Sequence, residues 1–118
     1  MLPSSYRLRS SSQFSVTIKE GAKKGSKTVV AHVFVPAAQP IATVGGPRVG
    51  LVVSKAVGNA VVRHGTSRQL RHAAWEVLQQ LEIPACATIV LRALPSSASA
   101  SYEELVNDVR SCIRRSLR

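Results

Sequence analysis

Several protein classes are excluded by what the sequence lacks. No stretch approaches the ~18 consecutive apolar residues of a membrane-spanning helix. The amino end has no apolar core of a secretory signal, so we expect a cytoplasmic protein. The only cysteines, Cys86 and Cys112, are too few for a disulfide framework and cannot by themselves form a structural zinc site. We therefore expect both to be reduced, partly buried thiols.

Acidic residues are also scarce, and their scarcity is confined to one part of the chain. There are 16 Lys and Arg against 6 Asp and Glu, which gives a formal net charge of +10. Residues 1–75 contain eleven of the basic residues but a single acid, Glu20, whereas residues 76–118 carry equal numbers of both signs. A charge that served solubility alone would have no reason to avoid the last part of the chain. The distribution therefore indicates an anion-binding face and a polyanionic partner.

The composition favours one folded domain. A chain of 118 residues is long enough for one domain and too short for two ordinary ones. Hydrophobic residues make up 45% of the chain, which allows a packed core and argues against a disordered protein. We expect residues 1–118 to form a single domain.

Three helices are predicted from apolar spacing and capping residues. The first covers residues 10–19, and the longest covers residues 59–81 with Asn59 as its N-cap. Ser101 and Glu104 have the spacing of a capping box, so the last helix begins there. The longest helix has one apolar stripe, formed by Val62, Thr66, Leu70, Ala73, Val77 and Leu81.

Strands are predicted where β-branched and apolar residues are concentrated, over residues 28–35, 48–54 and 87–92. The second of these is almost continuously apolar, which is typical of a buried central strand. A further short strand near Lys27 is also compatible with the sequence. The expected order is α-β-β-(β)-α-β-α, an α+β fold in which a small mixed sheet and helices form an α/β sandwich. The connections are a basic turn and two loops, at residues 23–27, 36–47 and 94–100.

The passage from the second strand into the longest helix contains the most informative residues. At about 100° per residue, five side chains of this helix face away from the apolar stripe. Guanidinium groups pair bidentately with phosphate oxygens, and an exposed indole offers a stacking surface. This face therefore suits a phosphate-bearing ligand. The five residues are His64, Arg68, Arg71, His72 and Trp75.

Two features at the start of this helix add to the anion-binding interpretation. Gly58 lets the backbone pass close to a ligand, and the free N–H groups after Asn59 form a weak anion site at the helix N-terminus. A simple turn followed by an N-cap explains the same two residues equally well. The arginines, likewise, fit a solvated face, but no acid lies between Glu20 and Glu76 to pair with them.

The order of these residues resembles the signature of the bacterial ribonuclease P protein subunit. The resemblance rests on Val-Gly-Leu-Val-Val-Ser-Lys at residues 49–55, then Gly-Asn-Ala-Val at residues 58–61. It extends to Arg-Leu-Arg at residues 7–9 and to Ser-Tyr-Glu-Glu-Leu at residues 101–105, so it covers nearly the whole chain. The central motif is long and specific. It continues with Arg63, Arg68 and Arg71.

The resemblance implies a fold and a function. The fold is a small α/β sandwich with an unusual left-handed βαβ crossover, which pattern reasoning would not propose because right-handed crossovers dominate. The function is that of a single RNA-binding domain that assists a catalytic RNA in removing the 5′ leader of precursor tRNA. The RNA and its Mg²⁺ ions perform the hydrolysis, so the protein is a subunit of an endoribonuclease without catalytic side chains or a cofactor of its own. The implied partners are ribonuclease P RNA and precursor tRNA, with no membrane and no DNA.

The resemblance also assigns residues position by position. A cleft for the single-stranded leader is assigned to Phe14, Arg9, His32 and Phe34, of which the last two share one face of a strand. Flat side chains in such a cleft stack on bases, worth about 1–3 kcal/mol per base. An ordinary core position explains Phe34 equally well. The residues that match the family's basic RNA-contacting motif are Lys55, Asn59, Arg63, Arg68 and Arg71.

The sequence departs from the family pattern in its most basic stretch. Ala56 stands where the family usually has a second lysine, and His64, Gly65 and Ser67 replace Asn, Arg and Lys. Gly65 also costs roughly 1 kcal/mol of helix stability relative to alanine. We therefore expect weaker RNA binding per molecule or compensation by other bases. The nearest candidates are Lys23, Lys24 and Lys27.

Two other functions remain open. A ribosomal-type structural RNA-binding protein has the same size and charge, although that class does not require the ordered central motif. A self-sufficient nuclease or phosphotransferase would need a carboxylate cluster or a phosphate-binding loop. Residues 21–75 contain no acid, and Gly58 is not followed by Gly-Lys-Ser/Thr. The histidines, moreover, have no carboxylate close in sequence to orient them.

Overall fold

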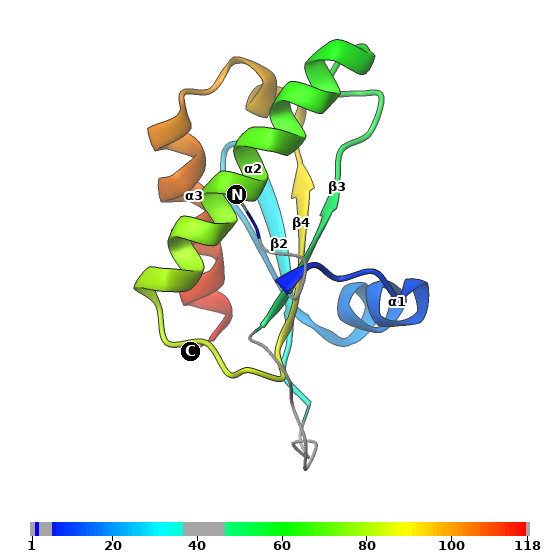
Figure 1. The fold of residues 1–118 in the computed structure, drawn as a ribbon, viewed down its shortest axis with the longest axis vertical. Helices are drawn as coiled ribbons and strands as arrows, with labels where there is room; N and C mark the ends of the chain where they lie inside the picture. The colour runs from blue at the N-terminus through cyan, green and yellow to red at the C-terminus, as the bar shows by residue number, and fades with distance from the viewer. Residues whose placement is uncertain (1, 3–5, 37–46, 118) are drawn as a thin grey trace.

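The computed structural model describes residues 2, 6–36 and 47–117, which form a sheet covered by helices on both faces (Figure 1). Helix α1 lies on one face, and helices α2 and α3 lie together on the other. The α+β sandwich predicted from the sequence is therefore confirmed. The elements are α1 (Ser11–Glu20), β1 (Ala22–Gly25), β2 (Val29–Phe34), β3 (Arg48–Val52), α2 (Ala60–Gln80), β4 (Thr88–Ala93), the 3₁₀ helix η2 (Pro95–Ser99) and α3 (Tyr102–Ser116).

Each of the three α-helices α1, α2 and α3 begins at a side chain that satisfies a free backbone N–H. Ser10 caps α1, and the Asn59 side chain accepts a hydrogen bond from the Val62 N–H at 3.0 Å at the start of α2. At α3 the Ser101 hydroxyl accepts from the Glu104 N–H, and the Glu104 carboxylate accepts from the Ser101 N–H. The predicted N-caps of α2 and α3 are confirmed.

The sheet has the strand order β1-β2-β4-β3 and is mixed. Strands β1 and β4 both pair with β2 in antiparallel fashion, and β3 pairs with β4 in parallel. The predicted central position of the strand at residues 48–54 is therefore wrong, because β3 lies at an edge. The strand is apolar because it is covered although it lies at an edge. Val49 faces the core, and Phe14 covers Gly50. On the outer side of the strand, the Leu8 N–H donates to the Val49 carbonyl at 2.9 Å.

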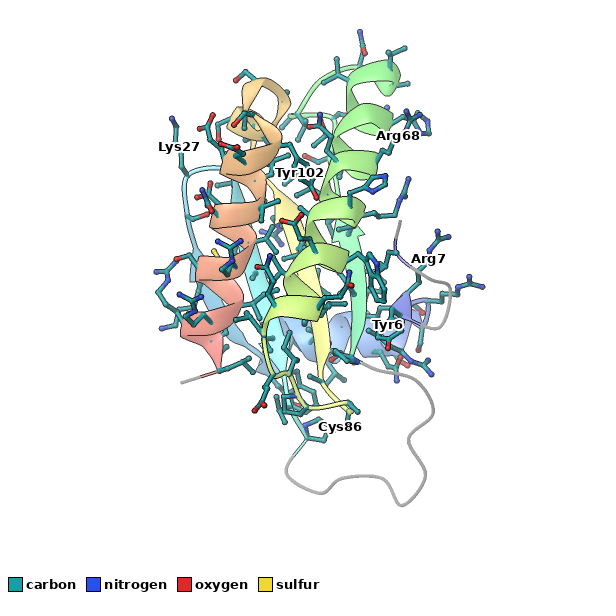
Figure 2. The ribbon with its side chains drawn as sticks, turned by 60° about the vertical axis from the view of Figure 1, so that its left-hand side comes forward. Tyr6, Arg7, Lys27, Arg68, Cys86 and Tyr102 are labelled. Carbon is teal, nitrogen blue, oxygen red and sulfur yellow. The ribbon has the colours of Figure 1, made fainter. Side chains whose placement is uncertain are left out.

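The connection from β3 through α2 to β4 is left-handed. Seen from the side that α2 and α3 cover, β3 and β4 both run upward, and β4 lies to the left of β3 (Figure 2). Because α2 crosses in front of them, the path turns in the opposite sense to nearly all βαβ units. The expectation drawn from the family resemblance is confirmed.

The structure tests two of the three predicted connections. The basic turn at residues 23–27 is wrong for its first half, which forms β1, with Lys23 opposite His32. Exposed lysines are tolerated there because β1 is an edge strand. The loop at residues 94–100 contains the short helix η2. Most of the predicted loop at residues 36–47 lies outside the described residues.

The main core fills the space between the sheet and the helices α2 and α3. Alternation along each strand sends Val29, Ala31 and Val33 into this core and turns Val30, His32 and Phe34 towards the face that carries α1. Both cysteines are free, Cys86 half-buried and Cys112 buried, as predicted. Among the described residues, no helix is long and apolar enough to cross a membrane. The helices contribute, among others, Leu70, Val77, Leu105, Val109 and Ile113 to the core.

Candidate nucleic-acid interface

The outer face of α2 carries several basic side chains. His64 and Arg68 are exposed, and Arg71 is half-buried. Figure 2 shows that Arg68 projects to the same side of the molecule as Arg7 of the N-terminal segment. Within residues 2, 6–36 and 47–117, Arg68 and Arg71 form no ion pair with a carboxylate. Their guanidinium groups therefore remain available to phosphate oxygens.

Three more of the predicted RNA-contacting residues lie at or near the N-terminal end of α2. Lys55 and Asn59 are exposed in and after the turn that follows β3. Arg63 is half-buried, and its Nε atom is buried without a hydrogen-bond partner in the described part of the chain. This end of α2 thus combines positive side chains with the positive end of the helix dipole, an arrangement that favours anions.

A groove of about 360 Å³ lies at the outer edge of β3. Arg7 and Arg9 come from the N-terminal segment, Arg71 comes from α2, and Phe14 comes from α1. Val49, Gly50 and Leu51 of β3 contribute to its lining. We call this the edge groove. The structure therefore brings Arg9, Phe14 and Arg71 together, although the sequence assigns them to two separate surfaces.

His32 lies on the α1 face of the sheet but has no free ring surface. It is 3% exposed, and neither ring nitrogen has a hydrogen-bond partner among the described residues. Burial lowers the pKa of His32, and the nearby positive charges of Arg92 and Lys23 lower it further, so the imidazole is neutral at pH 7. Stacking of a base on His32 would require its cover to move. Phe34, on the same face, is half-buried.

Lys23 and Arg92 lie beside His32 and were not assigned to the cleft from the sequence. Both are exposed, and Arg92 is the one exposed residue of the otherwise buried strand β4. The sequence offered a signal for Arg92: it is a charged residue in an otherwise apolar strand, and alternation places it on the same face as Val90. Lys23 and Arg92 give the α1 face of the sheet a positive charge, and the neutral His32 lies between them.

Trp75 does not offer the exposed stacking surface predicted from the helix pattern. Its ring contacts the ring of Tyr6 edge-to-face, with centroids 5.1 Å apart and an interplanar angle of 69°, and it packs against the core. The prediction is wrong because Tyr6 packs against this side of α2. A contact between residues so far apart in sequence leaves no trace in the helix periodicity.

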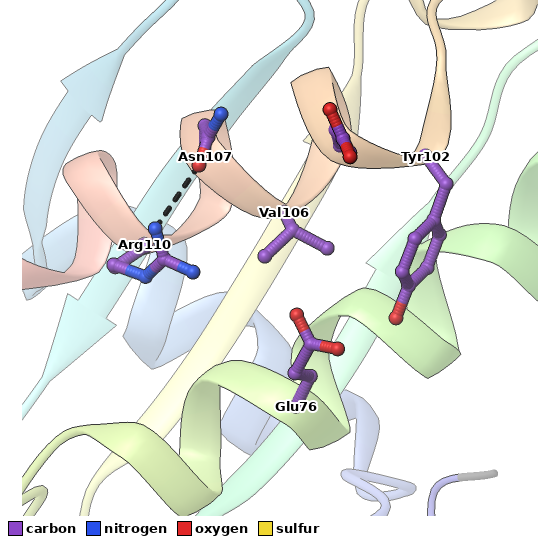
Figure 3. Close-up of a pocket in the computed structure, with 6 residues that line it drawn as sticks. Glu76, Tyr102, Val106, Asn107 and Arg110 are labelled. Atoms are coloured by element: carbon purple, nitrogen blue, oxygen red, sulfur yellow. Dashed lines mark hydrogen bonds between the residues drawn. The ribbon is translucent and has the colours of Figure 1, made fainter.

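The groove between α2 and α3 has the opposite character. It has a volume of about 510 Å³, and two acidic residues, Glu76 and Glu103, line it. Figure 3 shows the Glu76 side chain among the lining residues. Its one guanidinium, that of Arg110, donates to Asn107 at 3.0 Å and to Gln80 at 2.8 Å. Burial and the neighbouring Glu76 charge raise the pKa of Tyr102. We call this the acidic groove, and it is unsuited to phosphate.

The described residues offer no obvious protein metal site. No three His, Cys, Asp or Glu side chains gather closely enough in residues 2, 6–36 and 47–117 to hold an ion. The guanidinium groups and the Phe14 ring of the edge groove are groups that can bind phosphates and stack on bases.

Comparisons with known proteins agree with this geometry. The family model described as Ribonuclease P matches residues 2–117. A ribonuclease P protein component from Corynebacterium jeikeium is 56% identical, covering 99% of this chain and 98% of that protein. One from Corynebacterium diphtheriae is 52% identical, covering 96% and 94%.

Solved structures share the fold at much lower sequence identity. The ribonuclease P protein of Staphylococcus aureus superposes with a TM-score of 0.74 at 21% identity, covering 93% of this chain and 94% of that chain. That of Thermotoga maritima, solved with 1-(4-fluorophenyl)-2-thiourea, also has a TM-score of 0.74, at 19% identity and with coverages of 92% and 98%.

Proposed function

The chain belongs to the ribonuclease P protein family, and we propose that it binds the family's catalytic RNA and the 5′ leader of precursor tRNA, so that the RNA removes the leader. The observation that carries this proposal is a row of guanidinium groups that runs from Arg68 and Arg71 on α2 to Arg7 and Arg9 at the edge groove, none of which pairs with a carboxylate in the described part of the chain. Such a row neutralises phosphates and holds an RNA strand while another molecule cuts it.

The outer face of α2 is assigned to the catalytic RNA. Lys55 lies in the turn before α2, Asn59 is the N-cap of the helix, and Arg63 and Arg68 follow along it. Arginine contacts to phosphate position a folded RNA without reading its sequence. Because His64, Gly65 and Ser67 contribute no permanent charge here, this affinity depends strongly on the remaining arginines.

The leader is assigned to the α1 face of the sheet and the edge groove. Phe14 forms one wall of the groove, and Arg9 and Arg71 lie at the same groove to take the phosphates. Stacking tolerates any base, so this arrangement accepts leaders of different sequence. Phe34 and His32 lie farther across the same face of the sheet, on β2. Because His32 is buried, a leader can reach its ring only if the side chains that cover it move aside.

Mg²⁺ is assigned to the ribonucleoprotein as a whole, with the RNA as its main ligand. The protein's contribution is its positive charge, which reduces the repulsion between two RNA molecules. Fewer ions are then needed to bring the substrate to the catalytic RNA.

Reconstitution tests the proposal. Protein freed of RNA should leave precursor tRNA intact, and addition of the matching RNA subunit at low magnesium should give cleavage at the end of the leader. The RNA alone under the same conditions is the control and should be slow. Cleavage by RNA-free protein would support an independent nuclease instead. Failure to stimulate the RNA would support a ribosomal-type protein.

A further inference from the structure

The N-terminal residues Tyr6, Arg7, Leu8 and Arg9 form a strap across the outer edge of the sheet. The Leu8 N–H donates to the Val49 carbonyl at 2.9 Å, and Arg7 forms a parallel bridge with Val49. Leu8 is buried. The strap thus extends the sheet beyond β3 and covers backbone groups that an edge strand otherwise leaves free.

A second contact fixes the strap to the helix layer. The Tyr6 ring meets Trp75 of α2 edge-to-face, with centroids 5.1 Å apart. This geometry is the favoured one for two aromatic rings, because the positive edge of one faces the negative face of the other. The strap is therefore held at one point on the sheet, Val49, and at another on α2, Trp75.

These two contacts determine where the strap's arginines lie. The Arg7 Nε atom donates to the Leu2 carbonyl at 3.2 Å, which orients its guanidinium and leaves the terminal nitrogens for a ligand. Arg9 is exposed and, like Arg7, has no carboxylate partner among the described residues. Both line the edge groove together with Arg71, and Leu51 and Phe14 add an apolar surface.

The size and lining of the edge groove match one nucleotide of an RNA strand. Its volume of about 360 Å³ lies within the range of sites for small molecules. Three guanidinium groups can pair with phosphate oxygens, while a base contacts the apolar part of the lining. Without the strap, Arg71 would be the one positively charged residue among the described residues that line the groove.

We propose that Tyr6 and Trp75 are positioning residues for RNA binding, because their contact holds the strap so that Arg7 and Arg9 join Arg71 in a site for one nucleotide. The inference rests on the proposed function, since it deepens the same RNA-binding surface. Its physical basis is preorganisation: arginines on a docked segment lose less conformational freedom on binding than arginines on a free one. Neither aromatic residue needs to touch the RNA.

The test compares Tyr6→Ala, Tyr6→Phe and Tyr102→Ala in the complete protein. The probes are a short labelled single-stranded RNA and precursor tRNA, and the measurements are affinity and its dependence on salt. Tyr6→Ala should weaken binding about tenfold, with a salt slope lower by about one to two. Tyr6→Phe keeps the ring and should bind like the wild type. Tyr102→Ala, the matched control, removes a tyrosine at the acidic groove and should also leave binding unchanged.

A double-mutant cycle separates positioning from general stability. Arg9→Gln should weaken binding in the wild type and in Tyr102→Ala, yet have little effect in Tyr6→Ala, because the strap is already released there. Additive effects of Tyr6→Ala and Arg9→Gln would overturn the proposal, as would wild-type affinity and salt slope in Tyr6→Ala. If Tyr6→Ala does not fold, Tyr6→Leu takes its place. Absence of RNA binding by the wild-type protein would instead refute the proposed function itself.

Discussion

The ring of Phe14 on α1 lies directly over Gly50 on β3, so closely that a Cβ atom at residue 50 would overlap with the ring. Gly50 therefore allows α1 to approach the sheet at the point where the edge groove begins. A second contact, between the hydroxyl groups of Thr17 and Thr88 at 2.6 Å, fixes the middle of the same helix on β4. Together these contacts set the position of Phe14, the aromatic wall of the edge groove.

Gly50→Ala should accordingly displace Phe14. The added methyl group overpacks a buried site, which typically costs about 1–3 kcal/mol, and the displaced ring should weaken binding of single-stranded RNA. Urea unfolding and RNA binding measure the two effects. Gly25→Ala is the matched control, because a Cβ at residue 25 would only reach ordinary contact with Val30 at 3.7 Å. Equal losses in both variants would show that Phe14 is not responsible.

Gly65→Ala should stabilise the protein. Residue 65 lies inside α2, and nothing lies within 4 Å of the place where its Cβ would be. The substitution should therefore raise the free energy of unfolding by about 1 kcal/mol, as helix propensity predicts. Gly65→Arg should in addition strengthen RNA binding and steepen its salt dependence by about one unit of slope. A lower melting temperature for Gly65→Ala would contradict this view of an open helix surface.

Arg68→Ala and Arg71→Ala should each weaken binding to the catalytic RNA or to the leader. Each removes one phosphate contact, so the slope of affinity against salt should fall by about one. Arg110→Ala removes the same charge beside the acidic groove and serves as the control, with affinity and slope expected to stay near those of the wild type. Unchanged slopes for both test variants would place the binding face elsewhere.

His32 should make the protein less stable in mild acid. Its pKa is lowered in the folded state by burial and by Arg92 and Lys23, so the unfolded chain binds the proton more readily. The free energy of unfolding should then decrease as the pH falls below the ordinary histidine pKa of 6.5. Urea unfolding at pH 7.5 and at pH 5.5 measures the decrease. In His32→Phe the loss of stability between pH 7.5 and pH 5.5 should be smaller, whereas in the exposed-residue control His64→Gln it should equal that of the wild type. A loss in His32→Phe as large as in the wild type would show that other groups cause it.

Local features of the sequence determined the α-helices, three of the four strands and the charge of the surface. Asn59 and the Ser101–Glu104 pair marked the helix starts, because a capping side chain acts on backbone groups within the next three residues. The strands at residues 28–35 and 87–92 were recognisable by their β-branched and apolar residues, whose packing preferences are partly local. The excess of arginine and lysine over acids is a property of composition and needs no fold.

The tertiary structure alone decided which of these residues meet. The left-handed crossover and the edge position of β3 depend on the order of the strands in the sheet, which is β1-β2-β4-β3. Composition did not reveal this order, because an edge strand that is covered by another segment is as apolar as a central strand. The cover of Trp75 by Tyr6, the burial of His32 and the convergence of Arg7, Arg9 and Arg71 join segments that are distant along the chain. Periodicity reports only which side of an element a residue occupies; what lies opposite that side depends on packing between distant segments.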